Sequence, residues 1–332
     1  MSQLSQASDP SVGDEPEVEP VSHLAQLWAK KYILRLDAKD DTPNAQNLVQ
    51  QTAEKLENSL RTASVHAWSQ TENMIGHEVQ RHDIDNRLID PWQISQDSFV
   101  IYNKAIAIYK QEVPPEYLAR VVGSYIGQIR THYTSVDPRV IGFVSMQIHH
   151  TGQALLKQIS PLQRQKVNSY FKVIDDFLYM PLQRAYAAAG NYDYESPVLQ
   201  VVQKLLPMSS NIAKKICDRV IDLYPYYYTY SGSLKDTTVK NASIRDTEMF
   251  QIYLWVCVLE KNISSIQQEL FPLCVMLYPT LKVQWELVRQ MIHLLGKEIS
   301  ARLGEKEKKL FQPYFQVLWE MFSPEVFPES LN

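Results

Sequence analysis

Two histidines occupy matching positions in two similar segments of the chain. Residues 148–173 read IHHTGQALLKQISPLQRQKVNSYFKV and residues 292–317 read IHLLGKEISARLGEKEKKLFQPYFQV, so an ungapped overlay pairs His149 with His293. A histidine in such a place can ligate a haem iron or form a hydrogen bond to a buried chromophore. It can instead pack on a helix flank. We favour this second interpretation, because neither histidine has another ligand type beside it.

The remaining matches of the overlay are residues of a packed helix crossing. They pair Ile148 with Ile292, Gly152 with Gly296, Tyr170 with Tyr314, Phe171 with Phe315 and Val173 with Val317. A second match, upstream and in the same order, pairs FVIYNKAIAIYK from Phe99 with FQIYLWVCVLEK from Phe250. Because ordered self-similarity is the mark of internal repeats, the sequence predicts two divergent helical units that arose by duplication.

A second group of candidate ligands surrounds the end of a long helical pattern. His66, His77 and His82 occur there with Glu78, Asp83 and Asp85. The pair His77-Glu78 resembles the start of a zinc-protease motif, but the next histidine follows five residues later instead of four, which takes it off the shared helix face. We interpret the group as a solvated helix end.

The densest aromatic stretch could bind a protein partner. Tyr226, Tyr227, Tyr228 and Tyr230 lie together between Pro225 and a Ser-Gly turn. Tyrosine gives a large contact area at a small cost in conformational entropy, which suits an interface. The same rings could instead cover the helices with their faces in the core, and the sequence leaves both options open.

No catalytic arrangement is recognisable. There is no nucleophile elbow and no phosphate-binding glycine loop. Adjacent Asp175 and Asp176 direct their carboxylates about 100° apart on a helix, so we expect them to be exposed. Cys217, Cys257 and Cys274 lack CxxC spacing, and we expect buried free thiols in a reducing compartment. We therefore predict that the chain is not an enzyme.

Composition narrows the class of protein further. The 332 residues are 45% hydrophobic, which suits a large core and roughly two domains. Of the net charge of -4, the acidic residues of positions 1–22 account for -5, and the near-neutral remainder gives no electrostatic case for binding nucleic acid. We also find no secretory leader and no apolar run of membrane-spanning length, and we expect a cytoplasmic protein.

Helical spacing of apolar residues runs through almost the whole chain and predicts an all-α fold. Several predicted helices begin where a capping residue precedes a proline, an arrangement that suits the first helical turn. These pairs are Thr42-Pro43, Asp90-Pro91, Asp137-Pro138, Ser160-Pro161 and Ser196-Pro197. The predicted helices span residues 43–79, 94–111, 115–133, 138–158, 161–189, 197–206, 208–223, 243–261, 263–278, 281–301 and 305–322, after a first helix from residue 22.

Three stretches carry a resemblance to a known family. TSVDPRVIGFVSMQIHHTGQ, SYFKVIDDFLYMPLQRAY and PYFQVLWEMFSPEVFP are similar to a family of uncharacterised cyanobacterial helical proteins. The resemblance covers residues 99–328. It implies a cyanobacterial setting and no particular activity, cofactor or site.

We divide the chain into an acidic disordered tail (1–20), a first helical unit (21–190) and a second (191–332). Our first hypothesis is a non-enzymatic interaction or regulatory protein that needs no cofactor. It would act on a protein partner, with self-association as one option, and would be colourless when purified. Our second is a sensor or ligand-binding protein that holds a tetrapyrrole, or a similar apolar molecule, in a globin-like helical pocket near His149 and His293.

Overall fold

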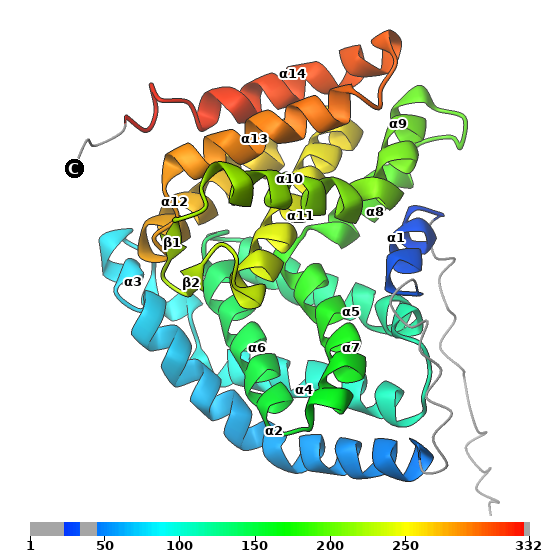
Figure 1. The fold of residues 1–332 in the computed structure, drawn as a ribbon, viewed down its shortest axis with the longest axis vertical. Helices are drawn as coiled ribbons and strands as arrows, with labels where there is room; N and C mark the ends of the chain where they lie inside the picture. The colour runs from blue at the N-terminus through cyan, green and yellow to red at the C-terminus, as the bar shows by residue number, and fades with distance from the viewer. Residues whose placement is uncertain (1–22, 34–44, 329–332) are drawn as a thin grey trace, which may run out of the picture.

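The computed structural model describes residues 23–33 and 45–328, and these residues form the predicted all-α fold (Figure 1). Within them, the β structure is one short antiparallel hairpin of β1 (Tyr228–Thr229) and β2 (Gly232–Ser233). No helix in this part of the chain is both long and apolar enough to cross a membrane. The predicted acidic tail, residues 1–20, lies outside the described residues.

The first half of the chain contains seven α-helices in its described part. They are α1 (His23–Ile33), α2 (Ala45–Ile75), α3 (Glu78–Arg81), α4 (Pro91–Lys110), α5 (Pro115–Thr134), α6 (Val140–Lys157) and α7 (Pro161–Tyr179). A 3-10 turn (Asn86–Leu88) precedes α4. The Asp90 carboxylate accepts the backbone N–H groups of Trp92 and Gln93, and Ser160 forms a capping box with Gln163. Both proline-linked helix starts were predicted from the sequence.

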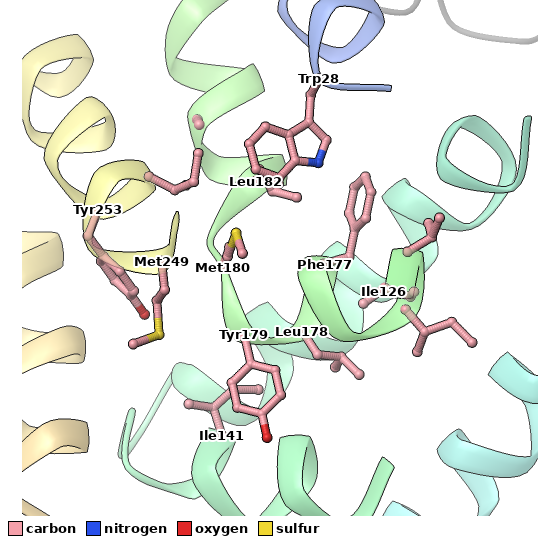
Figure 2. Close-up of a cluster of buried hydrophobic side chains, with 14 of the residues drawn as sticks. Trp28, Ile126, Ile141, Phe177, Leu178, Tyr179, Met180, Leu182, Met249 and Tyr253 are labelled. Carbon is pink, nitrogen blue, oxygen red and sulfur yellow. The ribbon is translucent and has the colours of Figure 1, made fainter. Parts of the chain in front are cut away.

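The predicted helix 161–189 is wrong, because the structure breaks it in two. Helix α7 ends at Tyr179, Met180 is extended with ψ 139°, and α8 (Leu182–Ala189) begins after Pro181. Proline has no N–H to continue the helix, and its ring disfavours a helical residue before it. Figure 2 shows that the resulting bend places Met180 among buried side chains from both halves of the chain, including Met249.

The second half of the chain consists of α8 and the helices that follow it. After α8 come α9 (Pro197–Leu205), α10 (Ser209–Leu223), α11 (Thr237–Glu260), α12 (Phe271–Thr280), α13 (Trp285–Ser300) and α14 (Glu305–Met321). A 3-10 turn (Leu206–Met208) links α9 to α10, and a π-helical segment (Ser265–Leu270) leads into α12. The predicted helix 263–278 therefore contains a local change of helical winding.

The two halves repeat a packing pattern. In the first, α2 packs on α4 and α6, and α7 packs on the same two helices. In the second, α10 packs on α11 and α13, and α14 packs on those two. The matched segments thus form consecutive helices in corresponding places, α6–α7 and α13–α14. This pattern agrees with a duplication, which itself stays a prediction, as does the division at residue 190.

The repeated glycines lie where another side chain passes closely over the helix. A side chain at Gly152 would overlap the Tyr102 hydroxyl, with Phe171 also in contact, and one at Gly296 would overlap the ring of Phe315. Phe171 and Phe315 are themselves a matched pair. The expectation of a close crossing at both glycines is therefore confirmed, and in both halves the next helix supplies an aromatic ring.

One hydrophobic core spans both halves, and Figure 2 shows part of it. Helix α1 contributes the fully buried Trp28 and packs on both α5 of the first half and α8 of the second. Ion pairs also join the halves: Lys31 of α1 lies 3.1 Å from Glu248 of α11, and Arg130 of α5 lies 3.2 Å from Glu269. The seam between the halves is thus continuous and partly ionic.

Candidate functional site

A cavity opens along this seam. It measures about 400 Å³ and lies between α6 and α7 of the first half and α11 and α12 of the second. The β1–β2 hairpin and the connection from α12 to α13 border it through Thr229, Ser231, Leu281 and Val283. A cavity of this size falls in the usual range for small-molecule and cofactor sites.

His149 lines this cavity, and its matched partner His293 does not. His149 is half-buried, and its Nδ1 lies 2.9 Å from Oδ2 of Asp175 on α7. His293 is exposed on α13, with its ring 6.0 Å from that of Trp319 on α14. Asp175 and Trp319 occupy equivalent positions two residues beyond the ends of the matched segments. The structure therefore places the two histidines equivalently in the fold but gives only His149 a charged partner and a cavity.

A positively charged group faces the same space from α11. The Arg245 guanidinium lies 3.7 Å above the ring of Tyr179, and Asp246 is 3.2 Å from it. Both α11 residues are largely buried and line the cavity. Burial raises the pKa of Asp246, and the charge of Arg245 acts in the opposite direction. The cavity therefore combines a guanidinium fixed on an aromatic face with a nearby carboxyl group.

His150 supplies a polar atom without a partner. Its Nε2 is buried and forms no hydrogen bond to any described residue, although the side chain lines the cavity. Burial lowers the pKa of His150 to about 4, and the charges of His149 and Lys157 act in the same direction. The imidazole is thus neutral at pH 7. An unsatisfied buried polar atom is uncommon in folded proteins and calls for an explanation.

The expectation that Asp175 and Asp176 are exposed is wrong. Asp176 is fully buried on the cavity floor, 2.7 Å from Lys172 and 3.1 Å from Lys31 of α1. Although burial acts to raise it, these two lysines lower the pKa of Asp176 to about 2. Glu248 of α11 completes the cluster, 3.1 Å from Lys31. The buried charge is tolerated because α1, α7 and α11 bring opposite charges together.

The three cysteines are free and buried, as predicted. Cys274 lines the large cavity, and burial raises the pKa of its thiol. Burial also raises the pKa of Cys217 to about 12. Both thiols are therefore protonated at neutral pH, and neither is an activated nucleophile.

The tyrosine stretch divides between surface and core. The rings of Tyr226, Tyr228 and Tyr230 are exposed, Tyr226 by 90%. Tyr227 is half-buried instead: its hydroxyl donates to the Lys282 carbonyl at 2.7 Å and accepts the Gln284 N–H at 2.7 Å. This hydrogen bonding fixes the stretch beside the cavity and leaves three rings facing outward.

The interpretation of the His66–Asp85 group as a solvated helix end is wrong at one residue. Glu78 is fully buried, with His77 at 2.9 Å and His82 at 3.0 Å, and it accepts the Thr280 hydroxyl of α12. The group therefore fastens α3 to α12. Among the described residues, no set of three or more potential ligands could hold a metal ion.

Most of the cavity's polar residues were not singled out from the sequence. Arg245 and Asp246 come from α11, whereas Asp175 and Tyr179 come from α7, about 70 residues earlier. The residue spacing within α7 or within α11 does not predict that the two helices meet at one cavity. The overlay of the two segments, extended by two residues, did offer a signal. It pairs Asp175 with Trp319, so an acidic residue accompanies His149 and a tryptophan accompanies His293.

A family model described as "Phycobilisome protein" matches residues 182–321, fewer than half of the 332 residues and corresponding to α8 through α14. This segment is similar to that cyanobacterial, all-helical, globin-like family. It includes α11, α12 and the hairpin, and it excludes α6 and α7 on the other side of the cavity. Searches of curated proteins and of solved structures find no match.

Proposed function

We propose that this chain binds an open-chain tetrapyrrole, a bilin, in the cavity between α6–α7 and α11–α12. The observation that carries the proposal is the charged, half-apolar cavity lined by the segment that matches phycobilisome proteins. The match favours a bilin-binding role in a light-harvesting setting over our first sequence hypothesis, a colourless interaction protein. The proposal involves no reaction and keeps the expectation that the chain is not an enzyme.

The residues of the cavity fit the chemistry of such a ligand. A bilin carries acidic propionate groups, pyrrole N–H donors and an extended aromatic body. Arg245 suits a propionate, because guanidinium groups bind carboxylates with directed hydrogen bonds. Asp246 and Asp175 can accept N–H donors, and the unpartnered Nε2 of His150 can be satisfied by a polar group of the ligand.

We propose that the ligand is held without a covalent bond. A thioether needs a reactive thiol, and the thiolate is the nucleophilic form. Cys274 is the cysteine that lines this cavity, and its burial opposes ionisation. Bound bilin should therefore separate from the chain when the protein is unfolded in denaturant, and colour that stays with the unfolded polypeptide on a denaturing gel would contradict this part of the proposal.

Titration with biliverdin tests the binding itself. We expect a saturable change in the visible absorbance spectrum at one ligand per chain. Arg245→Leu should weaken binding by about 10- to 100-fold, since hydrogen bonds to charged groups contribute about 1.5–3 kcal/mol. Arg219→Leu, on the exposed face of α10 and outside the cavity, is the matched control and should bind like the parent.

Two outcomes would reject the proposal. One is the absence of any saturable spectral change with biliverdin. The other is binding of haemin in a parallel titration with no binding of biliverdin, which would assign the cavity to a closed macrocycle and give His149 the role of an iron ligand.

The exposed tyrosines support a second candidate function, contact with a protein partner. Exposed aromatic rings are favourable anchors for an interface. Tyr226, Tyr228 and Tyr230 can be replaced together by serine, and we expect lost partner binding in a pull-down with nearly unchanged melting temperature. Tyr227→Phe is the control that keeps the ring and removes two hydrogen bonds of the hairpin anchor. Unchanged partners after the triple replacement would remove this candidate.

A further inference from the structure

A second, smaller cavity adjoins the first. It measures about 70 Å³ and lies between α10, α11 and α13. The two cavities share five lining residues, which form the boundary between them: Thr229, Ser243, Asp246, Tyr278 and Val283. Asp246 and Tyr278 therefore border both cavities.

The two cavities differ in chemistry. The large one contains Arg245, two histidines and several carboxylates, whereas the small one beyond its shared boundary is lined by aliphatic or sulfur-containing side chains and one threonine. Val220 of α10 and Val288 of α13 are both buried and line it. An apolar cavity of this kind offers few partners for water and takes up apolar groups instead.

The volume limits what the small cavity can hold. One water-sized group needs about 10–15 Å³ of such space, so 70 Å³ takes a group of roughly five to seven non-hydrogen atoms at most. That is the size of a vinyl or ethyl substituent with the ring edge that carries it, and it is too small for a second ring system.

From this arrangement we propose that the small cavity is a specificity subsite for the aliphatic end of the ligand. This inference rests on the proposed function for the identity of the ligand. The propionate side of the bilin lies towards Arg245, and an end ring directs its vinyl or ethyl group past Asp246 into the space beside Val220 and Val288. The ligand is therefore bound in one orientation, fixed by a charged group at one side and an apolar recess at the other.

Xenon gives a test of the recess that does not depend on the bilin. Xenon binds apolar cavities, and its occupancy can be followed by xenon NMR or in crystals under xenon pressure. We expect xenon beside Val220 in the ligand-free protein and its displacement when biliverdin is bound. Val220→Phe should fill the recess, abolish xenon binding and weaken biliverdin binding by about tenfold, the loss expected for two buried carbon atoms.

Controls separate filling of the recess from damage to the fold. Val65→Phe on the exposed face of α2 should change neither measurement. Because Val220→Phe can disturb packing, its unfolding midpoint is measured first. Met291→Phe fills the recess from α13 and serves as the second variant. Val220→Ala should enlarge the recess and raise xenon occupancy without loss of biliverdin affinity.

Each outcome has one meaning. Displacement of xenon by biliverdin, with weaker binding in both filled variants, supports the subsite. Xenon that stays bound alongside biliverdin, or unchanged biliverdin affinity in folded Val220→Phe and Met291→Phe, overturns the subsite while the proposed function stands. If the parent protein binds xenon but no biliverdin, the proposed function fails, and the inference fails with it.

Discussion

The helix pairs α6–α7 and α13–α14 contain the two matched segments and share a glycine–phenylalanine contact, yet their polar residues differ. In α6–α7 the paired positions hold His149 with Asp175 and Lys172 with Asp176. In α13–α14 the corresponding pairs are His293 with Trp319, and Gln316 with Glu320 at 2.8 Å.

Location explains the difference. Helix α7 faces α1 and α11, so Asp176 is fully buried and needs cations beside it, whereas Glu320 on α14 faces solvent. Apolar and glycine positions are constrained by the crossing that both pairs share. Polar positions are constrained by what covers the pair, and only the covered pair borders the large cavity. A repeated residue is thus evidence for repeated packing before it is evidence for a repeated site.

We expect the largest difference in stability between substitutions of Lys172 and of its counterpart Gln316. Lys172→Met leaves buried Asp176 and Glu248 with one fewer cation, and breaking a buried ion pair typically costs about 3–5 kcal/mol of unfolding free energy. Gln316→Met removes an exposed hydrogen bond and should change stability by about 0.5 kcal/mol or less. Denaturant unfolding of both variants gives the comparison, and equal midpoints would show that the buried cluster contributes no more than a surface pair.

Substitutions at the two glycine crossings should lower the free energy of unfolding by smaller and unequal amounts. Gly152→Leu and Gly296→Leu both overpack a close contact, at a typical cost of about 1–3 kcal/mol. We expect the larger loss at Gly152, because Tyr102 and Phe171 are fully buried there, whereas Phe315 beside Gly296 is half-buried and can move. Unfolding midpoints measure both costs. Midpoints equal to that of the parent would mean that the glycines are tolerated and not required.

The matched histidines should differ in their effect on ligand binding. His149→Leu removes a hydrogen bond with Asp175 at the cavity wall and leaves that carboxylate without its partner, so we expect biliverdin affinity to fall by about tenfold. His293→Leu lies on the exposed side of α13 and should bind biliverdin like the parent. Equal losses in the two variants would indicate two equivalent sites, as the repeat alone suggested.

The sequence was sufficient for features governed by neighbouring residues. Apolar spacing and capping residues before prolines located most helices, and the repeat drew attention to His149. It failed where distant segments decide the outcome. Asp176 was expected at the surface because its neutralising Lys31 lies on a helix about 145 residues away, and Arg245 was overlooked because its partner Tyr179 comes from the other half. The helix break at Pro181 could have been predicted from the proline itself. The apolar spacing continues across it, however, and led to the prediction of one helix.

The smallest expected effect concerns His150, where the second segment has Leu294. The pKa of His150 is lowered to about 4 by burial, below its ordinary value near 6.5, so the folded state favours the neutral imidazole. Between pH 6.5 and 4 the unfolded chain binds more protons at this position than the folded chain. The contribution to stability is therefore complete above pH 6.5 and declines as the pH falls towards 4.

His150→Leu gives the first segment the residue of the second and removes this titration. Unfolding free energy measured from pH 7 to pH 4 should then fall less steeply in the variant than in the parent. His66→Leu on the exposed face of α2, away from the cavity, is the control and should keep the parent's slope. Identical slopes in His150→Leu and the parent would mean that His150 is not held neutral by the fold, and the unpartnered Nε2 would then need no ligand to satisfy it.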